Sequence, residues 1–175
     1  MSQRITYSQV RGVFDALDQT AFLFNLGVLP GVGNNRQLAI KCMNVPLPGM
    51  SNEAFEAAVH GHVVRFRGRK VQSRQLNVTY YEDQNAATRL DLSRWHEQIV
   101  GTESGNSQGY KNFYSIRPQL LIFDHVGRVI EEMRFDGLFI QELSDVTMDG
   151  GSSQLVQVQA TFSFDEAHST RVARL

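Results

Sequence analysis

The sequence lacks the residues from which a disulfide framework or a membrane anchor is built. Its 175 residues include one cysteine, Cys42, which excludes an intrachain disulfide and a cysteine-based zinc cluster. No apolar run approaches the roughly 18 residues of a membrane span, and the first ten residues contain no apolar segment of signal-peptide length. We therefore expect no membrane partner and synthesis in a reducing, cytoplasmic compartment.

The chain also lacks an excess of charge of either sign. Its formal net charge is −1, whereas a free-standing nucleic-acid-binding domain usually has a clear basic excess. Lysine occurs only at positions 41, 70 and 111, so arginine supplies most of the positive charge. Because arginine suits paired and interface positions, this bias weakly favours protein contacts.

Residue patterns typical of catalysis are missing as well. No serine lies in a G-x-S-x-G motif, and the sequence has no phosphate-binding loop. Glu131 and Glu132 are adjacent, so on a strand they point to opposite faces and cannot act as a paired acid and base. His60 and His62 share a strand face with Glu56, but no further ligand is nearby, which favours solvated histidines over a metal site. We predict no enzyme, no metal and no cofactor.

One stretch, residues 76–100, has a clear pattern that organises the chain. Its first residues alternate as in a half-buried strand, and from Asp83 the spacing becomes helical. Thr88, Leu92, Trp95 and Ile99 then fall on one helical face. We expect Asp83 or Asn85 to cap this helix, Gly101 to end it and the sole tryptophan to pack it on a sheet.

The remaining patterns are mostly those of strands. Alternation or β-rich composition predicts strands over 21–28, 38–43, 115–124, 129–141 and 156–164, and one long strand or a bent pair over 55–67, where Gly61 permits a kink. The expected fold is mainly β: an antiparallel sandwich or barrel of about seven strands with one principal flanking helix. We expect a single domain over residues 1–175. It would include an N-terminal extension at 1–19, with a short amphipathic helix over 7–17, and a polar C-terminal tail at 165–175.

Two surface features suggest partner contacts. The segment around Pro46 and Pro48 must leave the sheet, and it bears the apolar residues Leu47 and Met50 where a loop is normally polar. The basic run from Arg65 to Lys70 has two readings, a solvated face or an inter-subunit salt-bridge surface, and the sequence favours neither. Cys42 is expected to be an inert core thiol.

Three segments carry a resemblance to a known family. They are AIKCMNVPLPG, LNVTYYEDQNAATRLDLSRW and VQVQATFSFDE, and their order resembles that of the tail tube protein of contractile-tailed bacteriophages. The resemblance covers residues 20–166. This chain departs from the family pattern in a longer N-terminal segment, a longer loop at 101–112 and a longer C-terminal tail.

The resemblance implies a structural virion protein of the phage tail, assembled in the host cytoplasm. Six copies would form a ring, and stacked rings would conduct DNA without binding it specifically. In each copy the strands at 38–43, 55–67, 115–124 and 129–141 would join a closed barrel, with lumen-facing candidates Lys41, Glu132, Arg134 and Asp136. Candidates for the contact between rings are Pro46, Leu47, Pro48, Met50 and Phe55. Candidates for subunit or sheath contacts are Arg65, Arg67, Arg69, Arg89, Arg94 and Glu97.

The implied partners are further copies of the chain, the tail sheath protein, and the baseplate and tail terminator proteins. Three alternatives remain open. The chain could be a baseplate tube initiator or terminator, or a tube component of a type VI secretion system, which shares the architecture. In a different class, it could be a small-molecule-binding β-barrel protein, which would need a pocket with convergent polar groups.

Overall fold

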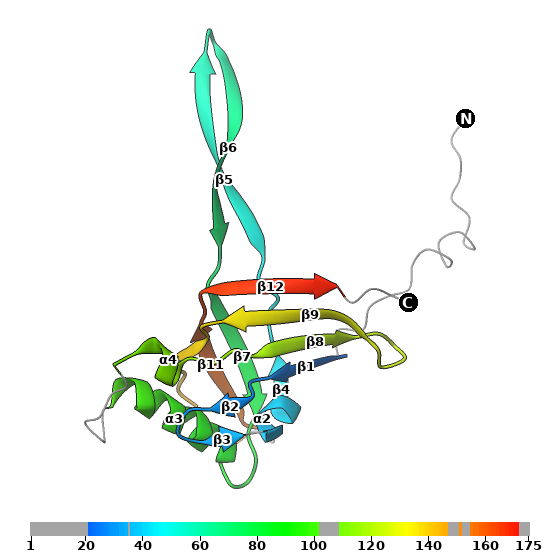
Figure 1. The fold of residues 1–175 in the computed structure, drawn as a ribbon, viewed down its shortest axis with the longest axis vertical. Helices are drawn as coiled ribbons and strands as arrows, with labels where there is room; N and C mark the ends of the chain where they lie inside the picture. Colours follow the sequence, from blue (N-terminus) through cyan, green and yellow to red (C-terminus); the bar gives the residue numbers. More distant parts are fainter. Residues whose placement is uncertain (1–20, 35, 102–108, 147–150, 152–154, 172–175) are drawn as a thin grey trace.

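The computed structural model describes residues 21–34, 36–101, 109–146, 151 and 155–171. Within them the chain is mainly β and forms two four-stranded antiparallel sheets (Figure 1). The first sheet has the order β1-β8-β9-β12, with β1 at Phe22–Asn25, β8 at Gln119–Phe123, β9 at Val129–Asp136 and β12 at Glu166–Arg171. The second has the order β10-β11-β7-β4, with β10 at Phe139–Leu143, β11 at Gln157–Ser163, β7 at Gln75–Tyr81 and β4 at Cys42–Asn44.

Two smaller pairs and three helices complete the described part. The pairs are β2 (Val28–Leu29) with β3 (Gly33–Asn34), and the long hairpin of β5 (Met50–Val59) and β6 (His62–Gln72). The helices are α2 (Arg36–Lys41), α3 (Ala87–Val100) and α4 (Lys111–Tyr114). No helix among the described residues is long and apolar enough to cross a membrane.

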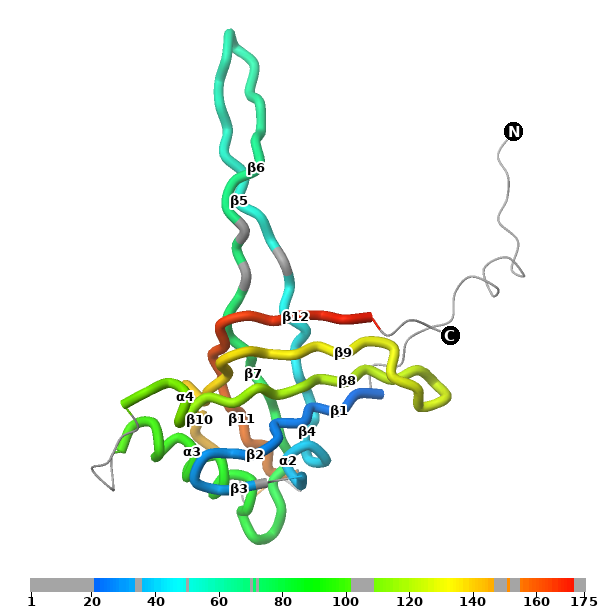
Figure 2. Tube along the Cα trace, viewed as in Figure 1, coloured from blue at the N-terminus to red at the C-terminus, as the bar shows by residue number. Residues whose placement is uncertain are grey.

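The two larger sheets share one hydrophobic core. Phe24, Leu120 and Phe135 from the first sheet belong to the same buried cluster as Val78 and Phe162 from the second. The strands of the two sheets run crosswise, and the β5–β6 hairpin stands away from both (Figures 1 and 2). The predicted antiparallel sandwich is therefore confirmed, and neither sheet closes into a barrel within the described chain.

The predicted strand and helix at 76–100 are confirmed. Leu76, Val78 and Tyr80 of β7 are completely buried, as the alternation requires. On α3 the residues Thr88, Leu92 and Trp95 are buried, and Ile99 packs against the core at the edge. The Trp95 ring stacks on Phe162 of β11 at 5.7 Å between centroids, and its Nε1 donates to the Tyr114 carbonyl at 2.9 Å. The tryptophan therefore holds the helix both to the sheet and to α4.

The start of α3 is held by two carboxylates. Asp83 Oδ1 accepts from the Ala87 N–H at 3.1 Å, and Glu82 accepts from the Thr88 and Arg89 N–H groups at 3.0 and 2.8 Å. These bonds satisfy donors that a helix start leaves without intrahelical partners. The cap predicted at Asp83 is thus confirmed, whereas Asn85 takes no such part. Gly101 ends the helix at φ +65°, as predicted.

Of the four strands expected to share one barrel sheet, 115–124 and 129–141 contribute β8 and β9 to the first sheet, whereas 38–43 and 55–67 do not join it. The strand predicted at 38–43 is itself wrong. Residues 36–41 form α2, and only Cys42–Asn44 continue as a strand. Leu38 and Ala39 are both buried, which a helix allows and a strand with alternating faces does not. Cys42 is half-buried opposite Tyr80, and burial raises the pKa of its thiol to about 12, as suits an inert core cysteine.

The strand predicted at 129–141 is divided between the two sheets. Gly137 has φ +65° and separates β9 from β10, and a Cβ at this position would collide with the Asp165 carboxylate. The strand predicted at 21–28 also ends early. Its pattern holds to Leu26, but Gly27 has φ +75° and turns the chain, so Val28 is exposed and Leu29 is buried.

Two further predictions are corrected at the level of whole elements. The polar tail at 165–175 contains β12, which pairs with β9 from Glu166 opposite Asp136 to Arg171 opposite Glu131. The stretch 55–67 is not one long strand but the bent pair, part of a hairpin that turns at His60 and Gly61, both with positive φ. The predicted helix at 7–17, the N-terminal extension and residues 102–108 of the long loop lie outside the described residues.

Candidate functional site

The first sheet has an apolar face and a polar face, both set by alternation along its strands. Its registers align residues into rows that cross all four strands. One row, on the face that meets the core, is Phe24, Leu120, Met133 and Ser169. The two neighbouring rows project outward, because successive residues of a strand point to opposite faces. One is Asn25, Gln119, Arg134 and His168, and the other is Leu23, Leu121, Glu132 and Thr170.

Three of the four predicted lumen residues lie together on this outward face. Glu132, Arg134 and Asp136 alternate along β9 with the buried Met133 and Phe135. The Arg134 Nε lies 2.6 Å from Glu132 Oε1, with Arg134 63% exposed and Glu132 20% exposed. The hydrogen bond to Glu132 raises the pKa of Arg134 above its usual range. The arginine is thus a fixed cation with its counter-charge directly beside it.

The fourth predicted lumen residue, Lys41, is in a different part of the molecule. It ends α2, and its Nζ lies 2.7 Å from Asp83 Oδ2 and 3.4 Å from Thr88 Oγ1. Its lumen role was expected from a strand over 38–43, whereas the residue ends a helix, so that strand no longer supports the role. The residue instead joins α2 to the start of α3.

Sequence reasoning missed three residues of the outward face whose side chains make ion-pair contacts. Arg117 Nε lies 3.2 Å from Asp136 Oδ1, and His168 Nε2 lies 3.2 Å from Glu166 Oε2 and 3.6 Å from Asp136 Oδ2. Glu166 and His168 belong to β12, which was interpreted as a tail. A period-two pattern is present there, but its inward residues are Ala167 and Ser169, which give no apolar signal.

Both outer edges of this sheet are open. Among the described strands, β1 pairs only with β8 and β12 only with β9. Successive strands are antiparallel across the four, so β1 and β12 run in opposite directions. A second copy placed with its β1 beside β12 would therefore meet it in antiparallel orientation.

The direction of the edge N–H groups follows from two backbone bonds. Phe123 N–H donates to the Ala21 carbonyl at 2.9 Å, and Phe135 N–H donates to the Pro118 carbonyl at 3.1 Å. Bonding direction alternates along each antiparallel strand, so every second residue of β9 bonds to β12. In β12 the N–H groups of residues 166, 168 and 170 then face β9, and those of Ala167 and Ser169 face the open edge.

The β5–β6 hairpin presents a continuous apolar face outside the core. Phe55 pairs with Phe66, and their rings stack at 5.4 Å; beyond them Ala57 pairs with Val64 and Val59 with His62. The two phenylalanines are 56% and 46% exposed. An exposed apolar face of this kind on a projecting arm is typical of a partner surface.

The opposite face of the hairpin is charged. Arg65 Nε lies 2.6 Å from Glu56 Oε1, and both side chains remain more than half exposed. Arg67 lies on the same face, paired with Ala54, and Arg69 lies next to Gly68 in the bulge. A Cβ at Gly68 would lie 2.8 Å from the Glu53 carbonyl oxygen, so glycine allows the two strands to cross closely there.

The predicted contact residues fall on separate elements. Pro46, Leu47 and Pro48 lie in the exposed or half-buried link before β5, Met50 begins β5, and Phe55 lies further along the hairpin. Arg89, Arg94 and Glu97 lie on α3 away from its buried stripe. The structure therefore does not bring the α3 residues together with the hairpin arginines. His60 lies in the hairpin turn and His62 begins β6, and no group of three potential metal ligands occurs among the described residues.

Comparisons with known proteins identify the architecture. A family model described as phage tail tube protein matches residues 13–170. No curated protein sequence matches that of this chain. A chain from the sheath/tube terminator of an extracellular contractile injection system has a similar fold, with TM-score 0.63 at 11% identity over 90% of this chain and 99% of the other.

Two other solved structures show the same fold. A chain from the sheath-tube complex of an extracellular contractile injection system in the extended state has TM-score 0.61 at 12% identity, covering 97% of this chain and all of the other. A chain from the tail of an empty gene transfer agent particle with C6 symmetry has TM-score 0.51 at 12% identity, covering 90% of this chain and all of the other. At these identities the likeness concerns the fold.

Proposed function

Because the chain belongs to the phage tail tube protein family, we propose that six copies close into a ring and that stacked rings conduct the genome. The chain is a structural subunit of a tail tube, so its role lies in its surfaces and not in a catalytic centre. The tube would lie inside a contractile sheath, assembled in the host cytoplasm. The observation that carries the proposal is the first sheet, which has an outward face bearing Glu132, Arg134 and Asp136 and, among the described strands, two unpaired edges.

Open edges are a liability that this assembly would remove. A strand with unpaired N–H and C=O groups is a template for pairing with another chain, and a closed barrel has no such edges. If β12 of one copy pairs with β1 of the next, the two strands are antiparallel. The same pairing can repeat between all neighbouring copies around a ring. The C6 symmetry of the gene transfer agent tail, which contains a chain of this fold, supports six copies.

The outward face of the first sheet would then line the lumen. It carries Glu132, Arg134 and Asp136, together with Arg117, Glu166 and His168, which the sequence did not indicate. Each of the two arginines lies beside a carboxylate, at 2.6 and 3.2 Å. A protein binds DNA phosphates when its cations neutralise them and release their counterions. Here each of the two arginines is already neutralised by a carboxylate of the protein itself. Such a lining suits passage of DNA without adhesion.

Other surfaces would join copies to each other and to the sheath. We assign the apolar face of the β5–β6 hairpin, with Phe55 and Phe66, to a neighbouring copy, since two exposed stacked phenylalanines gain most from burial. The link at Pro46–Pro48 remains a candidate for the same contact. The outer residues Arg89, Arg94 and Glu97 of α3 remain candidates for the sheath, baseplate or terminator.

A place at the end of the tube is the second candidate role. The structural neighbour from a sheath/tube terminator supports it, since that chain has TM-score 0.63. A terminator would expose one ring face to a different partner, so purified protein would form single rings and not long tubes. A type VI secretion tube component remains a third reading of the same architecture.

Proline substitution at the open edge tests the ring. In Ser169→Pro the N–H that faces the edge is lost, while the bonds from β12 to β9 remain, so the monomer stays folded. We expect the wild-type chain to form rings or tubes in negative-stain micrographs and Ser169→Pro to remain monomeric. Ser169→Ala is the matched control, because it keeps the N–H and loses only the hydroxyl bond to Glu131. Normal rings from Ser169→Pro would contradict edge pairing.

A further inference from the structure

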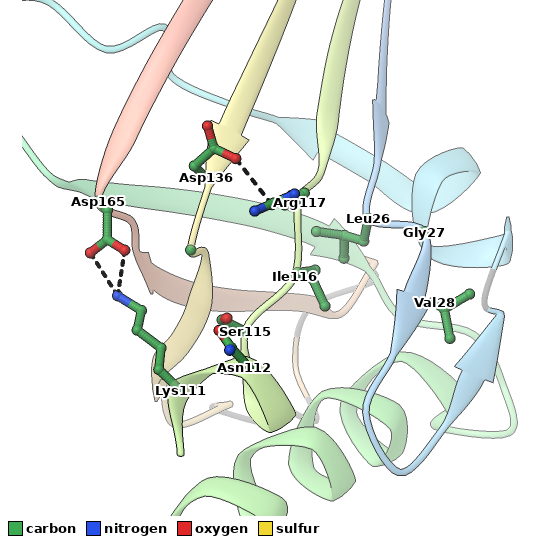
Figure 3. A pocket seen from close by; sticks show the side chains of 11 residues that line it. Leu26, Gly27, Val28, Lys111, Asn112, Ser115, Ile116, Arg117, Asp136 and Asp165 are labelled. Atoms are coloured by element: carbon green, nitrogen blue, oxygen red, sulfur yellow. Dashed lines mark hydrogen bonds and ion pairs between the residues drawn. The ribbon is translucent and has the colours of Figure 1, made fainter.

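A hollow lies at one end of the first sheet, where β8 begins and β9 ends (Figure 3). Its volume is about 660 Å³. Leu26 and Ile116 are buried in its wall, and Val28 lies at its side with 67% of its surface exposed. Volumes of this order are typical of pockets that receive a small ligand, so the hollow has room for a few side chains.

The rim of the hollow consists of charged side chains held in two ion pairs. Lys111 Nζ bonds to both Asp165 oxygens at 2.6 and 2.7 Å, and Arg117 bonds to Asp136 at 3.2 Å, as the dashed lines in Figure 3 show. Both aspartates keep about half of their surface exposed, at 56% and 45%. The rim thus offers carboxylate oxygens to an incoming cation beside an apolar wall.

The opposite end of the same two strands has a projecting turn at residues 124–128. Asp124 Oδ1 accepts from the Val126 and Arg128 N–H groups at 2.9 and 2.8 Å, and Gly127 N–H donates to the Asp124 carbonyl at 3.0 Å. These bonds fix the turn. At its tip Val126 is 63% exposed, and Arg128 is exposed beside it. The turn therefore presents an apolar side chain and a cation on a rigid support.

The hollow lies where β8 begins and β9 ends, and Figure 2 shows the turn at the opposite end of these two strands. In a closed barrel the strands tilt from the axis by only about 35–45°, so one end of each strand faces the ring above and the other faces the ring below. The β5–β6 hairpin projects crosswise to these strands, past the β12 edge, and so serves a different contact (Figure 1).

We propose that the turn at 124–128 of a copy in one ring enters the hollow of a copy in the next ring. Val126 would contact Leu26, Val28 and Ile116, and Arg128 would approach the carboxylates of Asp136 and Asp165. The proposal rests on the proposed tube function and names the contact by which its rings stack.

A disulfide cross-link between the two ends tests this contact. Tubes of the double variant Val28→Cys/Val126→Cys are oxidised and run on a non-reducing denaturing gel. The native Cys42 is half-buried with a raised pKa, so it interferes little. A contact between rings links one copy to the next along the tube. We therefore expect a ladder that extends well beyond six chains, disappears on reduction, and is missing from each single-cysteine variant.

Each outcome has a distinct meaning. Tubes without a ladder, or a ladder that stops at six chains, would overturn the stacking contact and leave the tube function intact. If the wild-type chain forms no rings at all, the proposed function itself fails. If the double variant does not assemble, single substitutions at Val126 test the stacking contact. We expect Val126→Asp to form rings that do not stack and Val126→Ala to form tubes. A small molecule retained by native tubes in one-to-one amount would make the hollow a ligand site instead.

Discussion

At the residue scale, Trp95 connects three parts of the fold. Its ring stacks on Phe162 of the second sheet, and its Nε1 donates to the carbonyl of Tyr114 in α4. The sequence identified its core position because the tryptophan falls on the helical apolar stripe. The bond to Tyr114 could not be foreseen, since it joins α3 to a helix beyond a loop with no pattern of its own.

Substitution of Trp95 separates packing from hydrogen bonding. Trp95→Phe keeps most of the ring but leaves the Tyr114 carbonyl without its donor, so we expect a loss of about 1–2 kcal/mol in unfolding free energy. Trp95→Ala also leaves a cavity and should cost about 3–5 kcal/mol. Urea unfolding of the unassembled protein followed by circular dichroism measures both, because the variants have lost the only tryptophan fluorophore. Equal losses would contradict this division.

Lys41 and Asp83 join α2 to α3 and make stability depend on pH. The hydrogen bond from Lys41, followed by that from the Ala87 N–H, holds the pKa of Asp83 below its usual value. A carboxyl whose folded pKa is depressed contributes stability above its unfolded pKa, near 3.9, and loses it as pH falls through the folded value. The contribution is therefore present at neutral pH.

Removing the ammonium should reveal this dependence. We expect Lys41→Met to melt at a lower temperature than wild type at neutral pH, and the difference to shrink as the pH falls through the lowered pKa of Asp83, below which the carboxyl is protonated in both proteins. Thermal unfolding across this range measures it. A difference that stays constant with pH would show that Lys41 acts through packing of its stem alone.

At the scale of elements, prediction succeeded where one face of an element is buried. β7 and β11 alternate between core and solvent, and α3 has a stripe of buried residues, so their patterns are visible in sequence. β12 escaped prediction because it is an edge strand whose inward residues are small or polar. The six residues of α2 are too few to distinguish a helical period from alternation.

The break between β9 and β10 has a different cause. Residues 129–141 read as one strand because both pieces alternate, and only Gly137 and Leu138 lie between them. That glycine lets the chain pass from the first sheet to the second, next to Asp165. A glycine in a strand pattern indicates a bulge or a bend without saying which, so the sheet to which each half belongs could not be deduced.

The β5–β6 hairpin should matter for assembly and little for the fold of the monomer. Phe66 lies outside the core and packs on Phe55, a pair worth about 0.5–1.5 kcal/mol. We expect Phe66→Ser to lower monomer stability by no more than this and to abolish or shorten tubes. Phe66→Leu keeps an apolar surface and serves as the control. Tubes of wild-type length from Phe66→Ser, seen by negative stain, would remove the hairpin from the assembly contacts.

The outer face of α3 has a separate test. Charge reversal in Arg89→Glu/Arg94→Glu leaves the buried stripe of the helix unchanged, so we expect the monomer to stay folded. If this face meets the sheath, the variant should form tubes to which sheath protein binds weakly or not at all, measured by co-sedimentation. Sheath binding equal to that of wild type would place the sheath contact elsewhere.

At the scale of the whole molecule, the two faces of one sheet serve two purposes. The inward face supplies the core, and the outward face carries arginines that are each paired with a carboxylate. The near-zero net charge of the chain agrees with a conduit that does not retain DNA. The sequence indicated this balance, but the residues of β12 that complete the face became visible only in three dimensions.

Removal of the carboxylate that pairs with Arg134 should make the lumen bind DNA phosphates more strongly. Glu132→Gln removes the carboxylate beside the guanidinium, which adds one positive charge per copy to the lining. In particles whose tail tube carries this change, we expect slower DNA ejection, with the difference reduced at high salt because released counterions drive phosphate binding. Glu132→Gln/Arg134→Gln should restore the wild-type rate. An unchanged rate in the single variant would show that this face does not meet DNA.

A reconstruction of the assembled wild-type chain by electron cryomicroscopy tests the central claim most directly. The account predicts a ring of six copies in which β12 pairs antiparallel with β1 of the next copy. The face bearing Glu132 and Arg134 would then line the channel. A ring that leaves these edges unpaired, or a channel lined by the second sheet, would contradict it.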